Sequence, residues 1–342
     1  MDKNAEILKK AISGSLDIVE QDREKEIISR RFGLTGNRET LEQIGEMLSI
    51  TRERVRQLEK AILIRLQISA EENQIPELAA AEKLLIRNLT EMGRVAKVSD
   101  LADKVYGRKT TASEKTGIHF IATFSKGLTV VEENDRYNSA IGIAEYGSTL
   151  YIKEKVDEIV NTLKANKKPM TLEELDNELD YEHPDYIKAM ASISKLLATL
   201  NGVWGLTKWP SVNPKNIRDK IFVVLETKKQ PMHFSEIAKE ISESNFKRKN
   251  VTIQAIHNEL IKDPRFVLIG RGIYALNTWG YKKGTISDII KSILEKAGKP
   301  MLREEIVKQV LKVRKVKETT ILLNLQNKTL FKKVDKNSYT LA

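Results

Sequence analysis

The sequence contains no cysteine, only four histidines and no apolar run of about 18 residues. Without cysteine, disulfide frameworks, thiolate zinc sites and cysteine nucleophiles are excluded. No two histidines stand at metal-ligand spacing, and no segment is long and apolar enough to span a membrane. The N-terminus is polar and of mixed charge, unlike a secretory signal. We therefore expect a cytoplasmic protein with no cofactor, no metal, no membrane contact and no small-molecule substrate.

The composition is that of a globular chain with an uneven charge. Its 342 residues are 41% hydrophobic and 31% charged, which suits several compact units rather than one core. The net charge is +11, yet residues 211–342 alone carry 27 basic against 13 acidic side chains, a net +14. The preceding residues carry a net −3. A basic excess confined to one part of the chain predicts an acidic partner there, with double-stranded DNA the first candidate.

An internal repeat occupies the chain after the first 70 or so residues. A Pro-Met pair marks it in segments 168–170, 230–232 and 299–301, and a weaker copy is centred on Ala96. Counted from the Met of each pair, or from Ala96 in the weaker copy, apolar residues recur at the same offsets. They form pairs four residues apart, both before and after the Pro-Met segment. This pattern predicts two short amphipathic helices with a proline-set turn between them. A third helix follows, as at 252–262, and the last three copies close with β-type runs ending aromatic-x-Leu.

Three helices and a β-hairpin in 60–70 residues are the outline of a winged helix-turn-helix. We therefore predict a mainly α fold with small β-wings, in which a helix-turn-helix domain precedes tandem winged-helix repeats. The shared aromatic residues are expected to pack each wing against its bundle. The expected domains are 1–70 for the helix-turn-helix, and 78–145, 151–210, 215–281 and 284–342 for the winged helices.

One of these repeats is similar to a known family. Segment 230–238 (Gln-Pro-Met-His-Phe-Ser-Glu-Ile-Ala), closed by segment 270–276 (Gly-Arg-Gly-Ile-Tyr-Ala-Leu), resembles the HARE-HTH domain. That winged helix occurs in the delta subunit of bacterial RNA polymerase, in chromatin proteins and in some restriction systems. The resemblance covers residues 216–281 and implies a link to transcription or DNA modification. It does not by itself imply DNA contact, because some members bind protein.

A restriction-type link makes it necessary to examine a possible nuclease centre. Pro184-Asp185 with Glu226-Thr227-Lys228 imitates the spaced pattern of acidic residues that holds Mg²⁺. The repeat, however, places Glu226 in the first helix of a winged unit, where the two carboxylates do not share a metal. No Walker-type loop, Gly-x-Ser-x-Gly elbow or His-Glu-x-x-His motif occurs. We therefore predict that the protein is not an enzyme.

The N-terminal segment shows the pattern of a helix-turn-helix. Segment 40–43 (Thr-Leu-Glu-Gln) is a capping box, segment 48–50 breaks the helix it opens, and Thr51 caps the next. In that second helix Val55, Leu58 and Ile62 form the apolar stripe. The polar residues Arg52, Glu53, Arg56, Gln57 and Lys60 share the opposite face. Such a face suits the major groove but is also typical of a helix that is merely solvated.

The residues themselves favour the first interpretation. Segments 24–34, 40–45 and 51–61, in this order and spacing, closely resemble region 4 of the primary sigma factors of bacterial RNA polymerase. The resemblance runs from about residue 22 to residue 66. It implies that the second helix reads a promoter −35 element, with base contacts from Arg52, Glu53 and Gln57. Backbone contacts would come from Arg54, Arg56 and Lys60.

The resemblance also implies a polymerase contact and shows two departures. The first part of region 4 docks on the flap of the polymerase β subunit. Ser49 stands where the family often has glycine in the turn, at a cost of about 1 kcal/mol for a left-handed residue. Because only about 20 residues precede the segment, we do not expect the sigma regions that bind the clamp and melt the −10 element. The residues implied for the flap contact are Ile27, Ile28, Arg30, Arg31 and Phe32.

The basic residues of the last two repeats predict a second DNA surface. They lie near the starts of the expected recognition helices and on the wings, where helix-turn-helix proteins meet phosphate, so they predict salt-sensitive backbone binding. A solvated basic face is the alternative. In the second repeat the equivalent stretch, 182–185, is acidic and predicts a spacer or protein contact. The predicted backbone residues are Lys247, Arg248, Lys249, Arg271, Lys312, Arg314, Lys315 and Lys317.

Two functions remain. The first is a sequence-specific DNA-binding transcription regulator or initiation-related factor, nucleoid-associated, in which the sigma-like helix supplies specificity and the basic wings add affinity. The second is an RNA polymerase accessory factor, delta-like and flap-binding, that acts mainly through protein contacts. Base-reading side chains at Arg52, Glu53 and Gln57 favour the first, since a flap binder does not need them.

Overall fold

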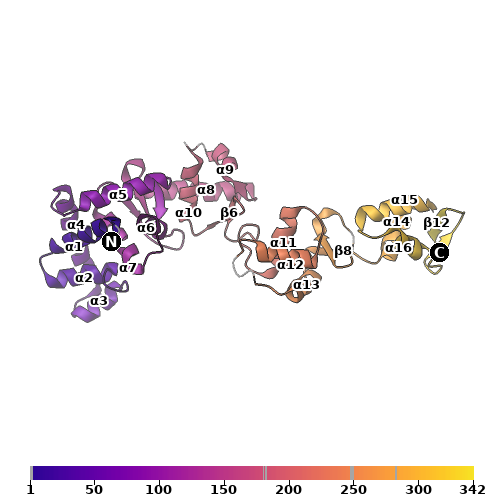
Figure 1. The fold of residues 1–342 in the computed structure, drawn as a ribbon, viewed down its shortest axis with the longest axis horizontal. Coiled ribbons are helices and arrows are strands. Elements are labelled where there is room, and N and C mark those ends of the chain that lie inside the picture. Colours follow the sequence, from indigo (N-terminus) through magenta and orange to yellow (C-terminus); the bar gives the residue numbers. More distant parts are fainter. Residues whose placement is uncertain (1–2, 180, 182, 247–249, 282) are drawn as a thin grey trace. The chain divides into compact units, whose positions relative to one another are not determined.

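The computed structural model describes residues 3–342 except 180, 182, 247–249 and 282 (Figure 1). The chain divides into two compact units, Met1–Lys208 and Trp209–Ala342, and each is described here by itself. As predicted, the fold is mainly helical, with small antiparallel wings. Four three-stranded sheets, with strand orders β1-β3-β2, β4-β6-β5, β7-β9-β8 and β10-β12-β11, accompany the helices of the described residues.

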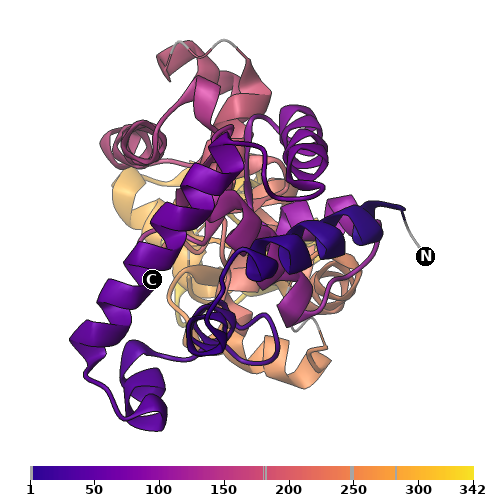
Figure 2. The ribbon, with the colours of Figure 1, turned by 90° about the vertical axis from the view of Figure 1, so that its left-hand side faces the viewer.

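The N-terminal unit begins with four helices. They are α1 (Lys3–Asp17), α2 (Asp22–Phe32), α3 (Leu41–Leu48) and α4 (Arg52–Glu71). Figure 2 turns this end of the molecule toward the viewer. Helices α3 and α4 follow the predicted pattern, because the break between them is a sharp turn at Ser49, whose φ of 54° is left-handed. The predicted capping box at Thr40 and the predicted N-cap at Thr51 are both present.

Two winged repeats complete this unit. In the first, β1 and β2 flank β3, and α6 and α7 stand where a winged helix has its helix-turn-helix. In the second, Thr171 and Glu174 form the predicted capping box at the start of α9. The first repeat comprises α5 (Leu78–Glu91), β1 (Val95–Lys97), α6 (Val98–Tyr106), α7 (Ala112–Phe124), β2 (Leu128–Val131) and β3 (Ala140–Ile143). After the 3-10 turn η1 (Ala144–Tyr146), the second comprises α8 (Thr149–Asn166), β4 (Met170–Thr171), α9 (Leu172–Leu179), α10 (Pro184–Ile193), β5 (Leu197–Leu200) and β6 (Val203–Leu206).

The second unit holds the last two repeats. The predicted third helix at 252–262 is present as α13, capped by Thr252, and Glu226 lies in the first helix of its repeat as predicted. The third repeat comprises α11 (Ile217–Lys228), β7 (Met232–His233), α12 (Phe234–Glu243), α13 (Ile253–Lys262), β8 (Phe266–Gly270), β9 (Ile273–Leu276) and the 3-10 turn η2 (Asn277–Trp279). The fourth comprises α14 (Ile286–Ala297), β10 (Met301–Leu302), α15 (Arg303–Val313), α16 (Glu318–Leu325), β11 (Phe331–Lys333) and β12 (Ser338–Leu341).

One hydrophobic core joins the N-terminal helices to the first winged repeat. Leu8 of α1, Phe32 of α2 and Leu66 of α4 belong to the same cluster as Phe120 of α7 and Ile141 of β3. All five side chains are buried. The expected boundary between residues 70 and 78 therefore does not separate two cores, and the helix-turn-helix is built into a larger body.

Candidate nucleic-acid interface

A small core of its own sets the angle between α3 and α4. Ile27 of α2, Ile44 of α3 and Val55 of α4 are fully buried against one another. Gly45 lies where α3 approaches the turn, and a Cβ at this position would be 2.7 Å from the carbonyl oxygen of Ile50. Glycine is therefore required there, because a side chain would push α3 away from the turn that leads to α4.

Side-chain caps fix the start of α4. The Thr51 hydroxyl accepts a hydrogen bond from the Arg54 amide at 3.2 Å. At the start of α3, Thr40 and Gln43 exchange hydrogen bonds, with distances of 2.9 and 3.2 Å. These caps satisfy amides that have no partner within their own helices. The end of α4 that would meet a ligand is thus held in a defined conformation.

The predicted reading face of α4 is exposed. Arg52, Glu53 and Gln57 all point to solvent while Val55 is fully buried on the opposite side. Three residues predicted to contact the DNA backbone, Arg54, Arg56 and Lys60, are exposed as well. The structure thus brings all six predicted DNA-contacting residues of this helix together on its solvent side.

The reading face is ordered by contacts among its own side chains. Arg56 donates to the Glu53 carboxylate from Nε at 2.8 Å and from Nη2 at 2.7 Å, and this ion pair lowers the pKa of Glu53. The Gln57 amide donates to Glu53 at 3.4 Å, and Arg54 donates to the Gln57 oxygen at 3.4 Å. Because all these side chains are exposed, the contacts hold rotamers in place but contribute little stability.

Helix α2 places its apolar residues in the interior. Ile27 belongs to the small core, whereas Ile28 and Phe32 belong to the large core and are 0% and 5% exposed. The implied flap contact through these three side chains is therefore wrong for this conformation, because a buried side chain offers no surface to a partner. Arg30 and Arg31 remain half-buried, but both are engaged in ion pairs.

These ion pairs tie α2 to its neighbours. Arg31 binds Glu59 of α4 at 3.1 Å. Glu24, which is largely buried, binds Arg65 of the same helix, closer to its C-terminus. Arg30 binds Glu39 at 2.8 Å, in the segment that leads to α3. Together with the apolar contacts, they fix α4 along much of its length.

Helix α7 of the first winged repeat supports the helix-turn-helix from behind. It packs against α1, α2 and α4. The rings of Phe120 and Phe32 meet edge to face at 5.0 Å between centroids. Thr116 donates to the Gly33 carbonyl at 3.2 Å, and Ser113 donates to the Leu34 carbonyl at 2.8 Å. The helix that reads DNA in a free winged helix is thus a structural brace in this repeat.

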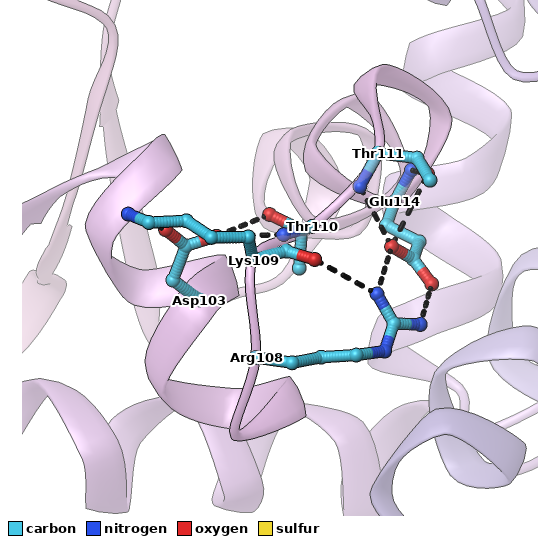
Figure 3. A network of polar contacts seen from close by, with 6 residues as sticks. All are labelled: Asp103, Arg108, Lys109, Thr110, Thr111 and Glu114. Carbon is cyan, nitrogen blue, oxygen red and sulfur yellow. Dashed lines mark hydrogen bonds and ion pairs between the residues drawn. The ribbon is translucent and has the colours of Figure 1, made fainter.

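A polar network fixes the start of this brace (Figure 3). Arg108 binds the Glu114 carboxylate at 2.6 and 3.0 Å and lowers its pKa to about 2. Glu114 also forms a capping box with Thr111 at the start of α7. On the other side of the loop, hydrogen bonds from Lys109 and Thr110 hold the pKa of Asp103 well below its usual range. The loop between α6 and α7 is therefore held at both ends.

The matching helix of the second repeat, α10, is also packed against its neighbour. The Arg94 guanidinium lies 3.9 Å from the ring centroids of both Tyr146 and Tyr186, the latter on α10. A Cβ on Gly93 would be 2.6 Å from the Asp185 carbonyl oxygen, so the backbones approach closely there. Helix α10 is thus used for packing within the chain, and the spacer or protein contact expected of this repeat stays a prediction.

The C-terminal unit presents some of its predicted basic residues and not others. Arg271 on the third wing and Lys312, Lys315 and Lys317 before α16 are exposed. Arg314 is not available as predicted, because its guanidinium donates to the carbonyl oxygens of Leu268 and Gly284 and is partly buried, which lowers its pKa. The predicted contacts at Lys247, Arg248 and Lys249 lie outside the described residues.

The described residues offer little else that carries chemistry. Among them, no three or more His, Asp or Glu side chains gather in a way that could hold a metal ion. In the same part of the chain, no helix is long and apolar enough to cross a membrane. The exposed face of α4 and, separately, the basic surface of the second unit are the candidate nucleic-acid contacts.

Comparison with known proteins identifies two segments of the chain. The chain resembles RNA polymerase sigma factor SigA of Listeria monocytogenes and that of Listeria innocua, with 37% identity over 73 residues in each case. This segment is 21% of the chain and 19% of either relative. It also resembles RNA polymerase sigma factor sigB of Arabidopsis thaliana, 39% identical over 61 residues, or 18% of the chain and 11% of that protein. The chain thus spans a fifth or less of the length of these relatives.

Two family models match two separate segments of the chain. Residues 217–279 match HARE-HTH, a helix-turn-helix domain named after ASXL and restriction endonuclease proteins among others. Residues 21–67, which contain α2, α3 and the reading face of α4, match region 4 of sigma-70. Both resemblances inferred from the sequence are confirmed: the chain carries a sigma-70 region 4 segment near its N-terminus and a HARE-HTH segment in its second unit.

Proposed function

We propose that this protein is a sequence-specific DNA-binding transcription factor that reads a −35-like promoter element through α4. The observation that carries the proposal is the exposure of Arg52, Glu53 and Gln57 on one face of a capped and braced helix. Arginine grips guanine O6 and N7, glutamine pairs with adenine, and glutamate accepts from cytosine N4. A helix-turn-helix presents such residues near the start of its second helix, which is where they stand in α4.

Backbone contacts supplement this reading in the proposal. Arg54, Arg56 and Lys60 flank the reading residues and suit the phosphates on either side of the groove. The exposed basic residues of the second unit add an affinity that does not depend on sequence and that falls with salt. The net +14 of residues 211–342 supports this division of roles. No catalytic step is assigned to the chain, and its site of action would be the nucleoid in the cytoplasm.

The alternative is an RNA polymerase accessory factor. Its support lies in the region 4 and HARE-HTH segments, since both types of domain occur in proteins of the transcription machinery. The burial of Ile27, Ile28 and Phe32 speaks against a flap contact through α2. An accessory role would therefore use other surfaces of the chain, and it would leave the exposed arrangement of Arg52, Glu53 and Gln57 without a purpose.

Selection from randomised duplexes, followed by measured affinities, tests the proposal. The wild-type protein is expected to enrich one sequence, and the double variant Arg52→Ala, Gln57→Ala is expected to lose that preference while it keeps weak nonspecific binding. Each bidentate base contact discriminates by about 1–3 kcal/mol, so the specificity ratio should fall about fivefold to 150-fold per contact.

A matched control separates reading from general charge. Arg87 on α5 is exposed and lies outside the helix-turn-helix, so Arg87→Ala removes one positive charge without touching the reading face. It should leave the preference intact. A wild-type protein that enriches no sequence, or a double variant with unchanged preference, would refute the proposal.

A further inference from the structure

A cavity of about 330 Å³ opens in the N-terminal unit, between the helix-turn-helix and the first winged repeat. Its walls come from four parts of the chain: the end of α2 with the segment before α3, the junction of β1 and α6, helix α7, and the β2–β3 hairpin. Residues that line it include Phe32, Arg38, Lys97, Lys115, His119 and Ser139. The cavity plays no part in the proposed reading of DNA by α4.

Three positive side chains converge on this cavity. Two carboxylates lie near them: Glu133 in the lining, and Glu132, whose pKa is lowered first by its contact with His119 and also by the charge of Arg38. Arg38, Lys97 and Lys115 reach it from three different elements. Within the part of the chain that the structure describes, none of the three forms an ion pair with a carboxylate. Glu133 also lines the cavity, but it is bound to Lys195 at 2.6 Å. Cations brought together in this way repel one another, and a bound anion relieves that repulsion.

A buried polar side chain, His119, lines the cavity. His119 is 6% exposed, with its Nε2 atom 3.3 Å from a carboxylate oxygen of Glu132, and Phe32 packs beside its ring. The first turn of α6 lies in the wall, with Val98 and Ser99 in the lining, and no side chain caps this helix. The Val98 amide donates to the Ser139 carbonyl oxygen at 3.0 Å, so the first turn of α6 contributes the positive end of its helix dipole, and not that amide, beside the three cations.

We propose that this cavity binds a small phosphate-bearing molecule. Arginine and lysine together are the usual binders of phosphate, and the volume lies at the lower end of the range of small-molecule sites. A ligand held by Arg38 on one side and by Lys97 and Lys115 on the other links the segment before α3 to the winged repeat that braces it. Binding would therefore stabilise the orientation of the helix-turn-helix. This inference goes beyond the proposed function, and its first test needs no DNA.

Titration calorimetry of the full chain with pyrophosphate and with adenosine diphosphate, at fixed ionic strength, tests the site. Wild-type protein is expected to bind at least one of the two probes. The double variant Lys97→Met, Lys115→Met removes two charged donors, each worth tenfold or so, and should raise Kd by about a hundredfold. Arg38→Gln is a second variant from a different element, and it should raise Kd by about tenfold.

Lys164→Met is the matched control, because Lys164 is an exposed lysine on α8 that does not line the cavity. It should leave the Kd unchanged. Equal Kd values in wild type and both cavity variants would overturn the proposal. The proposal would also be overturned if neither probe bound the wild-type protein. If the same variants then weakened binding to a DNA duplex, the three cations would belong to a DNA backbone contact instead.

Discussion

Replacing Phe120 with alanine tests whether α7 holds the DNA-reading helix in place. Phe120 is fully buried in the large core, with Phe32 of α2 and Phe124 of α7 each 5.0 Å away between ring centroids. Phe120→Ala removes the ring and leaves a cavity in the large core, which also contains side chains of α2 and α4. We expect the destabilisation to reach α4, although Phe120 lies about 50 residues away from it in the sequence.

The magnitude follows from burial and ring contacts. Phe-to-Ala changes in cores cost about 3–5 kcal/mol, and each aromatic pair contributes about 0.5–1.5 kcal/mol of that. Because Phe120 is fully buried and makes two such pairs, we expect the upper part of this range. Native-state hydrogen exchange measures the effect by residue: amides of α4 that exchange through opening of the shared core should do so a hundredfold to several thousandfold faster.

The reasoning fails if only the first winged repeat is affected. Unchanged protection in the second half of α4, where Ile62 and Leu66 enter the large core, would show that the helix-turn-helix is stable by itself. Leu150→Ala is the control, since Leu150 is 70% exposed, and this substitution should change the unfolding free energy by less than about 0.5 kcal/mol.

Three further predictions concern the turn, the brace and the basic surface. Ser49→Gly should stabilise the chain by about 0.5–1 kcal/mol in denaturant unfolding, because φ at Ser49 is 54°; a loss of stability would contradict the strain assigned to it. Glu114 has a lowered pKa in the folded state. The stability it contributes is therefore complete above pH 4.5, the ordinary pKa of the group, and is lost as the pH falls toward 2. The thermal midpoint should fall over that window less steeply in Glu114→Gln than in wild type, and equal slopes would exclude the Arg108 network as a source. Replacing three exposed lysines should reduce the slope of log K against log salt for nonspecific DNA by about one unit per lost phosphate contact, and an unchanged slope would remove this surface from the interface. These lysines are Lys312, Lys315 and Lys317.

Local features of the helix-turn-helix were predictable from the sequence because their causes are local. A capping box joins residues three apart, as Thr40 and Gln43 do, and the turn at Ser49 lies between two such signals. The repeated Pro-Met segments likewise set helices and strands within a short stretch of chain. The exposed reading face of α4 followed from helical spacing alone, once Val55 was assigned to the buried side.

The contacts of α2 were not predictable in the same way. Ile27 and Ile28 are apolar neighbours on one helix, and spacing shows only that each is expected to be covered. Helical spacing does not show whether these side chains are buried by another protein or by the same chain. In the structure Ile27 turns into the small core and Ile28 into the large one, beside a helix almost 90 residues further along. Arg314 is a similar case, since its charge was visible in the sequence but its carbonyl partners were not.

The burial of α7 could have been inferred from its own sequence, although the repeat pattern did not indicate it. Residues 117–124 are nearly all apolar or small, whereas a helix that reads DNA is polar on one side. The first repeat is the weakest copy, and the repeat pattern by itself assigns no role to its third helix. Such an all-round apolar helix indicates packing on two sides, and here the second side is covered by α1, α2 and α4.

The packing of α7 and α10 limits which helices of the N-terminal unit are free to contact DNA. Helices α7 and α10 are occupied by contacts within their own unit, which agrees with the proposal that α4 is the reading element there. That unit carries no net positive charge, so its affinity for DNA depends on few contacts and a wrong base is costly. A strongly basic unit with the same reading helix would bind any sequence well and lose discrimination. In the proposed function, the excess charge of the second unit adds affinity through the DNA backbone, while α4 decides which sequence is bound.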